Sequence, residues 1–193
     1  ADGYFVLPTT VSNYLAQQKP LDLDKDYPEA AEAVASSQAR IDQLLNAPDP
    51  QKTPDEFHRQ LGSIMWDACG MAREKNQLES AITQIKALRK QFWQQVQVTG
   101  VDKDLNQTLE RAGRIADFIE LAELMCIDAL TREESCGCHA RAEHISEDGE
   151  AQRHDEDFSY VAAWQYSGKI SMPVLYKEEL NFKFVRPNTR NYR

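Results

Sequence analysis

Residues 105–131 read LNQTLERAGRIADFIELAELMCIDALT, a stretch without proline that is long enough for about seven helical turns. Its apolar residues recur at steps of three and four, the period of one face of an α-helix. The stripe comprises Leu105, Leu109, Ala112, Ile115, Ile119, Ala122, Cys126 and Ala129. Further apolar side chains broaden it, namely Phe118, Leu121, Leu124 and Met125. We therefore expect a long helix that is covered on more than one side.

Two other amphipathic segments precede this one. Thr53-Pro54-Asp55-Glu56 combines an N-cap, a first-turn proline and a capping-box glutamate, so a helix is predicted to begin there. Residues 74–98 carry a nearly heptad apolar stripe that ends before Thr99-Gly100. The stripe consists of Leu78, Ala81, Ile85, Leu88, Phe92 and Val96. The links between the three segments are short, which favours antiparallel packing of neighbours.

A further helix, at about residues 28–47, is predicted between Pro28 and Pro48. The fold class is therefore mainly α, an antiparallel three-helix bundle with a preceding helix, in a domain spanning 28–132. Residues 1–27 are expected to be an incoming connection, irregular apart from a short helix within 11–18. Residues 133–193 are expected to form a glycine turn, an acidic loop and a tail with a small β element or extended arm, because 158–166 and 170–185 are β-prone.

Charge and composition exclude several classes of protein. The 193 residues carry a formal net charge of −9, which disfavours binding to nucleic acid or anionic lipid. No stretch approaches the roughly 20 apolar residues that span a bilayer. The four cysteines lack the spacing of a secreted disulfide framework, so a reducing compartment is expected. The first residues contain neither an initiator methionine nor a signal sequence, which indicates a piece of a longer chain.

Chemistry-bearing residues gather in 133–141, which reads EESCGCHAR. Cys136-Gly137-Cys138-His139 could supply zinc ligands or a reactive Cys–His pair, but there is no second cysteine pair and no orienting third group can be named. The favoured interpretation is a tight glycine turn packed against another domain. Cys69 and Cys126 fall on apolar stripes and are expected to be buried. The three tryptophans, Trp66, Trp93 and Trp164, are expected in a core or a domain interface.

Several stretches together resemble the C-terminal region of the flavoprotein subunit of succinate dehydrogenase and fumarate reductase, in the type found in Bacteroides-like bacteria. They are Ala1 to Pro8, Arg40 to Leu45, Thr131 to Arg141, Arg153 to Phe158 and Arg190 to Arg193. The second is similar to the family's Ala-Arg-Ile-Asp-x-Leu, and the third to its Arg-x-Glu-Ser-Arg-Gly-Ala-His-x-Arg. Two positions depart from the latter motif, because Cys136 replaces its arginine and Cys138 its small residue.

The resemblance implies a spectrin-like three-helix bundle that packs on a flavin-binding domain. It also implies a parent oxidoreductase that interconverts succinate and fumarate by hydride transfer to FAD, on the cytoplasmic face of the inner membrane. Electrons would pass to an iron–sulfur subunit and, indirectly, to a membrane cytochrome b subunit. The fragment itself is expected to be inactive, with no catalytic, cofactor-binding or metal residues. The alternatives are the C-terminal domain of the related L-aspartate oxidase and a free-standing helical adaptor.

Candidate interface residues come from the glycine turn and the tail. They are Glu134, Ser135, Gly137, His139, Arg141, Arg186, Arg190 and Arg193. Between 143 and 157 there are seven acids against a single arginine, whereas 177–193 carries five basic residues against two acids. Complementary charge steers docking, so we expect 136–193 to contact the flavin domain and border the iron–sulfur subunit. The direction of the reaction, the quinone and the roles of Cys136 and Cys138 stay open.

Overall fold

The computed structural model describes residues 2–19, 27–101, 105–168, 172–185 and 188. The chain divides into two compact units, 1–40 and 41–193. The first contains α1 (Asp2–Ala16) and most of α2 (Pro28–Leu45). A short helix within 11–18 was the prediction for this region, and α1 is both earlier and longer. Pro8 lies inside α1, and the helix continues past it although a proline removes one backbone amide donor. The domain boundaries at 27/28 and 132/133 stay predictions.

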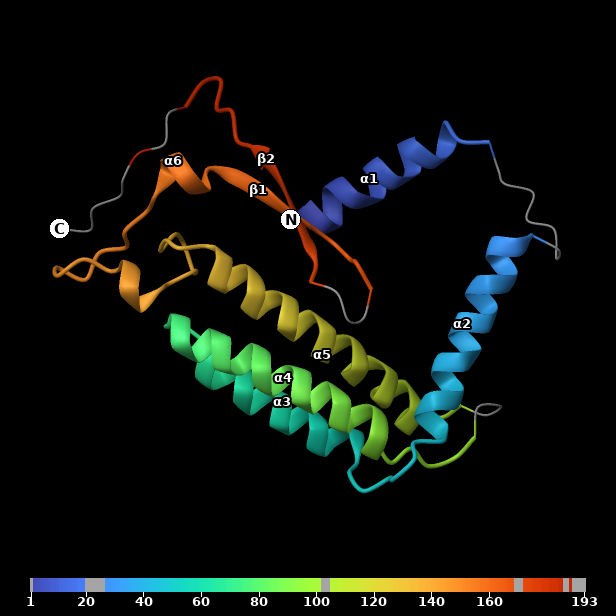
Figure 1. Cartoon of the computed structure of the whole chain (residues 1–193). Coiled ribbons are helices and arrows are strands. Elements are labelled where there is room, and N and C mark those ends of the chain that lie inside the picture. The colour runs from blue at the N-terminus through green and yellow to red at the C-terminus, as the bar shows by residue number, and fades with distance from the viewer. Residues whose placement is uncertain (1, 20–26, 102–104, 169–171, 186–187, 189–193) are drawn as a thin grey trace. The chain divides into compact units, whose positions relative to one another are not determined.

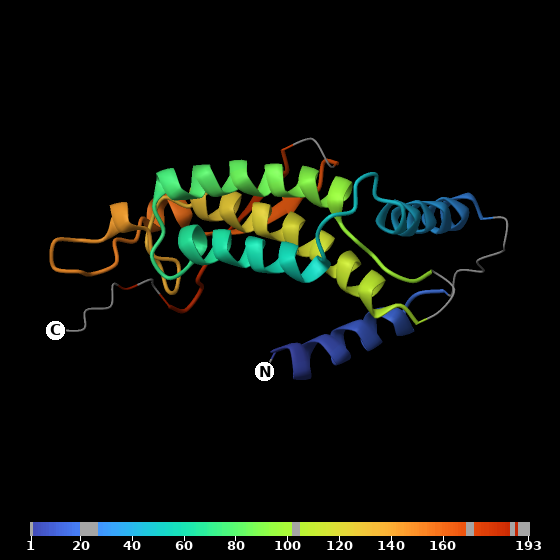
Figure 2. The ribbon, with the colours of Figure 1, turned by 90° about the horizontal axis from the view of Figure 1, so that it is seen from below.

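The second unit is built on three long helices, as predicted. They are α3 (Pro54–Cys69), α4 (Lys75–Gln95) and α5 (Gln107–Thr131), and each packs against the other two. Figures 1 and 2 show them side by side, with α4 running opposite to α3 and α5. This up-down-up order follows from the short loop after α3. None of the described helices has the length and hydropathy of a membrane-spanning segment.

The core of the bundle confirms the predicted stripes. Ile85, Leu88, Ile115 and Ile119 are all at most 4% exposed. Phe57 and Phe92 meet edge to face with ring centroids 5.2 Å apart. Cys69 and Cys126 are buried free thiols, as expected. A hydrogen bond to Cys69 and burial raise the pKa of the Cys126 thiol, so that it stays protonated.

The helix ends also follow the sequence signals. The Thr53 side chain accepts from the Glu56 amide, and the Glu56 carboxylate accepts from the Thr53 amide, which completes the predicted capping box. Asn106 caps α5 through the Leu109 amide. The helix predicted over 74–98 ends earlier, at Gln95, because Val96 turns into extended backbone beside Lys52.

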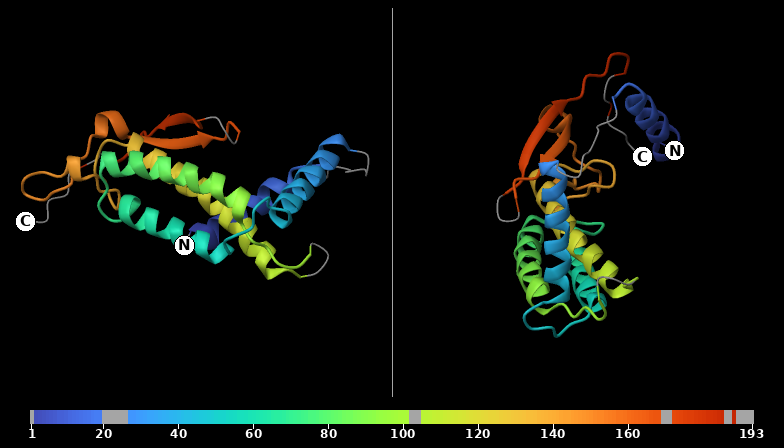
Figure 3. Two further views of the ribbon diagram at one scale, coloured as in Figure 1. Left: turned by 60° about the horizontal axis from the view of Figure 1, so that its bottom comes forward. Right: turned by 90° about the vertical axis from the view of Figure 1, so that its right-hand side faces the viewer.

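A β-hairpin covers one side of the bundle. It consists of β1 (Tyr160–Gln165) and β2 (Val174–Glu179), paired antiparallel from Tyr160↔Glu179 to Gln165↔Val174. Two short helices precede it, η1 (Ala142–His144) and α6 (Asp155–Phe158). The indole Nε1–H of Trp164 donates to Asp128 Oδ1 at 2.7 Å, which ties the hairpin to α5. Figure 3 shows the hairpin lying along the bundle. The predicted small β element is thereby confirmed.

The structure narrows two expectations about apolar side chains. α5 packs against α3 and α4 and is tied to the hairpin through Trp164 and Asp128, but Phe118, Leu121 and Met125 are exposed. The neighbours of α5 therefore cover only part of its apolar surface. Trp66 is 83% exposed and so lies outside the core, which leaves a domain interface as the prediction for it, whereas Trp93 packs against the core.

Candidate functional site

The predicted glycine turn is present and is closed by backbone hydrogen bonds. The Cys136 amide donates to the His139 carbonyl at 2.9 Å, and the His139 amide donates to the Cys136 carbonyl at 3.0 Å. Gly137 has φ +61°, a left-handed conformation that favours glycine. Gly137 and Cys138 are exposed at the tip of the turn. The turn therefore presents a small protruding surface at the C-terminal end of α5.

Arg141 is buried and caps that end of α5. Its Nη1 donates to the carbonyl oxygens of Ala129 at 2.9 Å and Leu130 at 3.2 Å. A third carbonyl, of Arg132, lies at 3.5 Å. Arg141 itself is only 1% exposed. A cation at this position satisfies the orphan carbonyls of the last turn and complements the negative end of the helix dipole.

Glu134 and Ser135 are equally buried and hold the turn in place. The Glu134 carboxylate accepts from Arg132 Nε at 2.8 Å and from the His154 amide at 2.9 Å. Ser135 Oγ accepts from the Arg141 amide at 2.8 Å and donates to the Arg141 carbonyl at 3.1 Å. These side chains are thus used in contacts within this chain. Their proposed part in a domain interface stays a prediction.

His139 is fixed in one tautomer by two neighbours. Its Nε2 lies 2.9 Å from the Arg132 carbonyl and must donate, so Nδ1 accepts from Arg73 Nη1 at 2.8 Å. Burial and the adjacent Arg73 guanidinium hold the pKa of His139 below its usual value of 6.5. The neutral ring links α5 to the loop after α3 and has no lone pair left for a metal.

The other predicted interface residues, Arg186, Arg190 and Arg193, lie outside the described residues. Among the described residues of the tail, Asn188 accepts through its carbonyl from Arg153 at 3.1 Å, and Arg153 also pairs with Asp155. Within the described part of the chain, no group of three or more histidine, cysteine and acidic side chains could hold a metal ion.

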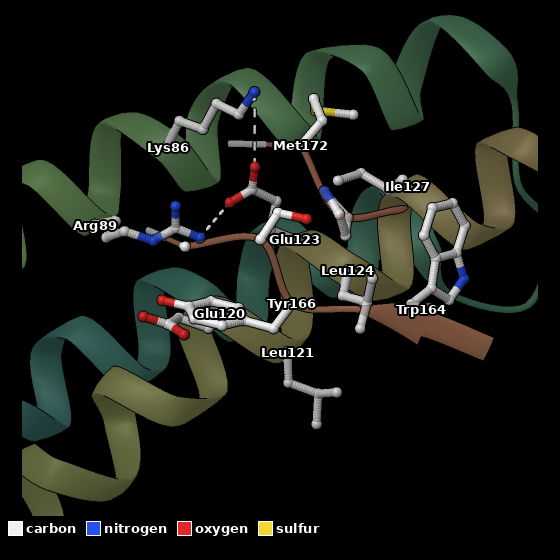
Figure 4. Close-up of a pocket in the computed structure, with 13 residues that line it drawn as sticks. Lys86, Arg89, Glu120, Leu121, Glu123, Leu124, Ile127, Trp164, Tyr166 and Met172 are labelled. Carbon is white, nitrogen blue, oxygen red and sulfur yellow. Dashed lines mark hydrogen bonds and ion pairs between the residues drawn. The ribbon is translucent and has the colours of Figure 1, made fainter. Parts of the chain in front are cut away.

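A cavity of about 510 Å³ lies between α4, α5 and the hairpin, and sequence reasoning missed it. Figure 4 shows its lining, with charged side chains toward the start of α5 and apolar ones toward Trp164. The charged residues are Lys86, Arg89, Glu120 and Glu123, and the apolar ones include Leu121, Leu124, Ile127, Trp164, Met172 and Pro173. The sequence did contain a signal for the charged end of the cavity. Lys86 with Arg89, and Glu120 with Glu123, are spaced i, i+3, which places both members of each pair on one helix face.

Glu123 is the centre of the charged group. Its side chain is 11% exposed and accepts from Arg89 Nη2, while Lys86 Nζ lies 3.6 Å from its other oxygen. Two cations therefore share this carboxylate. Arg89 Nε is buried and has no hydrogen-bond partner among the described residues. Tyr166 lines the same cavity from the hairpin side.

Comparisons with known proteins agree with this fold. Residues 58–192 match the family model described as fumarate reductase flavoprotein C-term. A fumarate reductase flavoprotein subunit of Haemophilus influenzae is 20% identical over 138 residues, covering 72% of this chain and 23% of that protein.

Solved structures show the same fold. An E. coli quinol fumarate reductase FrdA variant superposes with a TM-score of 0.69 at 21% identity, covering 86% of this chain and 27% of the other. A chain of the Mycobacterium smegmatis Sdh1 complex superposes with a TM-score of 0.72 at 17% identity, covering 91% of this chain and 28% of the other. A quinol–fumarate reductase chain with menaquinol molecules superposes with a TM-score of 0.72 at 20% identity, covering 92% of this chain and 29% of the other.

The chain thus spans about a quarter of the length of the relatives it matches. The matched residues include α4, α5, the glycine turn and the hairpin, together with most of α3. The chain belongs to the fumarate reductase flavoprotein C-terminal family.

Proposed function

We propose that this chain is the C-terminal structural and docking domain of an FAD-dependent succinate dehydrogenase or fumarate reductase flavoprotein subunit. The parent enzyme interconverts succinate and fumarate by hydride transfer to FAD. It passes electrons to an iron–sulfur subunit and, indirectly, to a membrane cytochrome b subunit on the cytoplasmic face of the membrane. The observation that carries the proposal is the family match over 58–192, which takes in nearly all of the bundle and the tail.

The FAD of the parent enzyme belongs, in this proposal, to a domain outside this chain. A dinucleotide site needs a glycine-rich turn from a strand into a helix, whose N-terminal amides face the phosphates. The described glycines with positive φ are Gly100, Gly137, Gly149 and Gly168, and none of these joins a β-strand to a helix. This observation supports placing the FAD in a domain outside these 193 residues, whose own contribution in this proposal is to packing and docking.

Exposed apolar side chains support a docking role. In the tail, Phe182, Phe184 and Val185 are exposed, and Phe184 reaches 90%. Leu121 and Met125 add apolar surface on α5. Large apolar side chains clustered at a surface mark interaction sites. The flavin-binding domain of the parent subunit is the partner that we assign to this surface.

The basic tail is the part that we place beside the iron–sulfur subunit. Its arginines are positively charged and the segment 143–157 is acidic. Charged patches that complement those of a partner raise the rate of association and fix its register more than they increase affinity. Because such effects are screened by salt, they weaken at high ionic strength.

The experiment neutralises Arg186 and Arg190 together in the full-length subunit and measures co-purification of the iron–sulfur subunit at low and high salt. We expect reduced recovery at low salt and a smaller dependence on salt. Arg114→Gln is the control, because its side chain is 60% exposed on the bundle. Recovery equal to that of the unmutated subunit in both conditions would show that the tail takes no part in docking.

A further inference from the structure

The cavity between α4, α5 and the hairpin has the dimensions and the lining of a small-molecule site. Its volume of about 510 Å³ falls within the usual range for ligand pockets. Such pockets are mostly apolar with a few convergent polar groups. Leu124, Ile127 and Trp164 supply apolar walls, and charged residues are confined to the opposite end (Figure 4). The ligand must therefore have one polar end and one apolar end.

The charged side chains at the polar end of the cavity determine which ligand group can bind there. Glu123 neutralises one of the two cations that contact it, so Lys86 and Arg89 together retain one positive charge. Both keep N–H donors that Glu123 does not use, since a guanidinium has five and an ammonium three. These donors fit a carboxylate of the ligand.

The same end also carries an unmatched acid. Glu120 lines the cavity one helical turn before Glu123, on the same face of α5. None of the ion pairs seen among the described residues involves it. A carboxylate next to spare cationic donors disfavours a ligand with negative charge alone. It favours one that also carries an ammonium group.

Trp164 of the hairpin forms one wall of the apolar end of the cavity. The Trp164 indole N–H is already satisfied by Asp128 at 2.7 Å, so its ring is fixed and offers only apolar surface to the cavity. From Glu120 to Ile127 the helix rises by about 10 Å. That length accommodates an α-amino acid with a large apolar or aromatic side chain.

We propose that this cavity binds a zwitterionic amino acid with an apolar side chain, such as phenylalanine. Its carboxylate contacts Arg89 and Lys86, its ammonium contacts Glu120, and its side chain packs against Leu124, Ile127 and Trp164.

The test compares three probes that differ by one charged group. L-Phenylalanine, 3-phenylpropionate and phenethylamine are titrated calorimetrically into the 193-residue chain. Phenylalanine is expected to bind tightest, with each analogue weaker by about tenfold, since each loses one charged hydrogen-bonded contact. A ¹⁵N spectrum locates the site, because the Trp164 indole signal, assigned with Trp164→Phe, is expected to shift while those of Trp66 and Trp93 stay in place.

Glu120→Gln separates the ammonium contact from the rest of the site. It is expected to weaken phenylalanine by about tenfold and to leave 3-phenylpropionate unchanged or tighter. Glu110→Gln is the matched control, because Glu110 lies on the same helix but its partner is the exposed Arg114. Equal binding of phenylalanine and 3-phenylpropionate would overturn the proposal. So would equal effects of the two variants, a shift confined to Trp66 or Trp93, or no binding of any probe.

Discussion

Replacing Arg141 with methionine tests whether this buried guanidinium holds the end of α5. Methionine keeps much of the side-chain volume but removes every donor. The carbonyls of Ala129 and Leu130 then lose partners at 2.9 and 3.2 Å. Arg132, at 3.5 Å, adds little. Two hydrogen bonds to a charged group at about 1.5–3 kcal/mol each give an expected loss of about 3–6 kcal/mol in the free energy of unfolding.

The assay is urea unfolding followed by far-ultraviolet circular dichroism, with Arg114→Met as the matched control. Arg114 lies on the same helix, and its pair with Glu110 is solvent-exposed, so its loss is expected to cost under about 0.5 kcal/mol. The salt bridge of Arg141 to Glu143 is half-exposed and is not counted. If both variants unfold at the same urea concentration, Arg141 does not cap the helix and the reasoning is refuted.

Three further predictions use the same unfolding assay. Ile115→Ala is expected to cost about 2–5 kcal/mol, because Ile115 is buried in the bundle, and an unchanged midpoint would place it at the surface. Thr53→Ala is expected to cost about 1 kcal/mol through loss of the capping box, and a cost equal to that of an exposed Thr83→Ala control would refute the cap. Because His139 has a lowered pKa in the fold, the unfolded chain binds more protons below pH 6.5. Stability is therefore expected to fall as the pH drops below about 6.5, and His139→Asn is expected to flatten this slope.

The bundle was predictable because its signals are local. The stripes of α4 and α5 and the capping box at Thr53 depend on residues within a few positions of one another. The same local reasoning failed at α1, which begins earlier than the helix expected within 11–18 and contains Pro8. It also placed the end of α4 too late, since the pairing of Val96 with Lys52 joins segments far apart in the sequence.

The sites depend on such distant contacts. The last turn of α5 contains no basic residue, so its carbonyls needed a donor from elsewhere. Arg141 supplies it only because the chain turns back at Gly137. The cavity likewise forms where the hairpin meets α4 and α5, and the only local signals for it were the i, i+3 spacings of Lys86 with Arg89 and of Glu120 with Glu123.

Hydrogen exchange most directly tests whether this chain is a docking domain. Amide exchange of the 193-residue chain alone is compared with that of the same residues within the full-length subunit. We predict that the buried amides of α4 and α5 exchange equally slowly in both. The hairpin and the segment 180–185 are predicted to exchange faster in the chain alone and to gain protection in the subunit, because their exposed apolar side chains are then covered. Identical exchange of these segments in both samples would contradict the docking role.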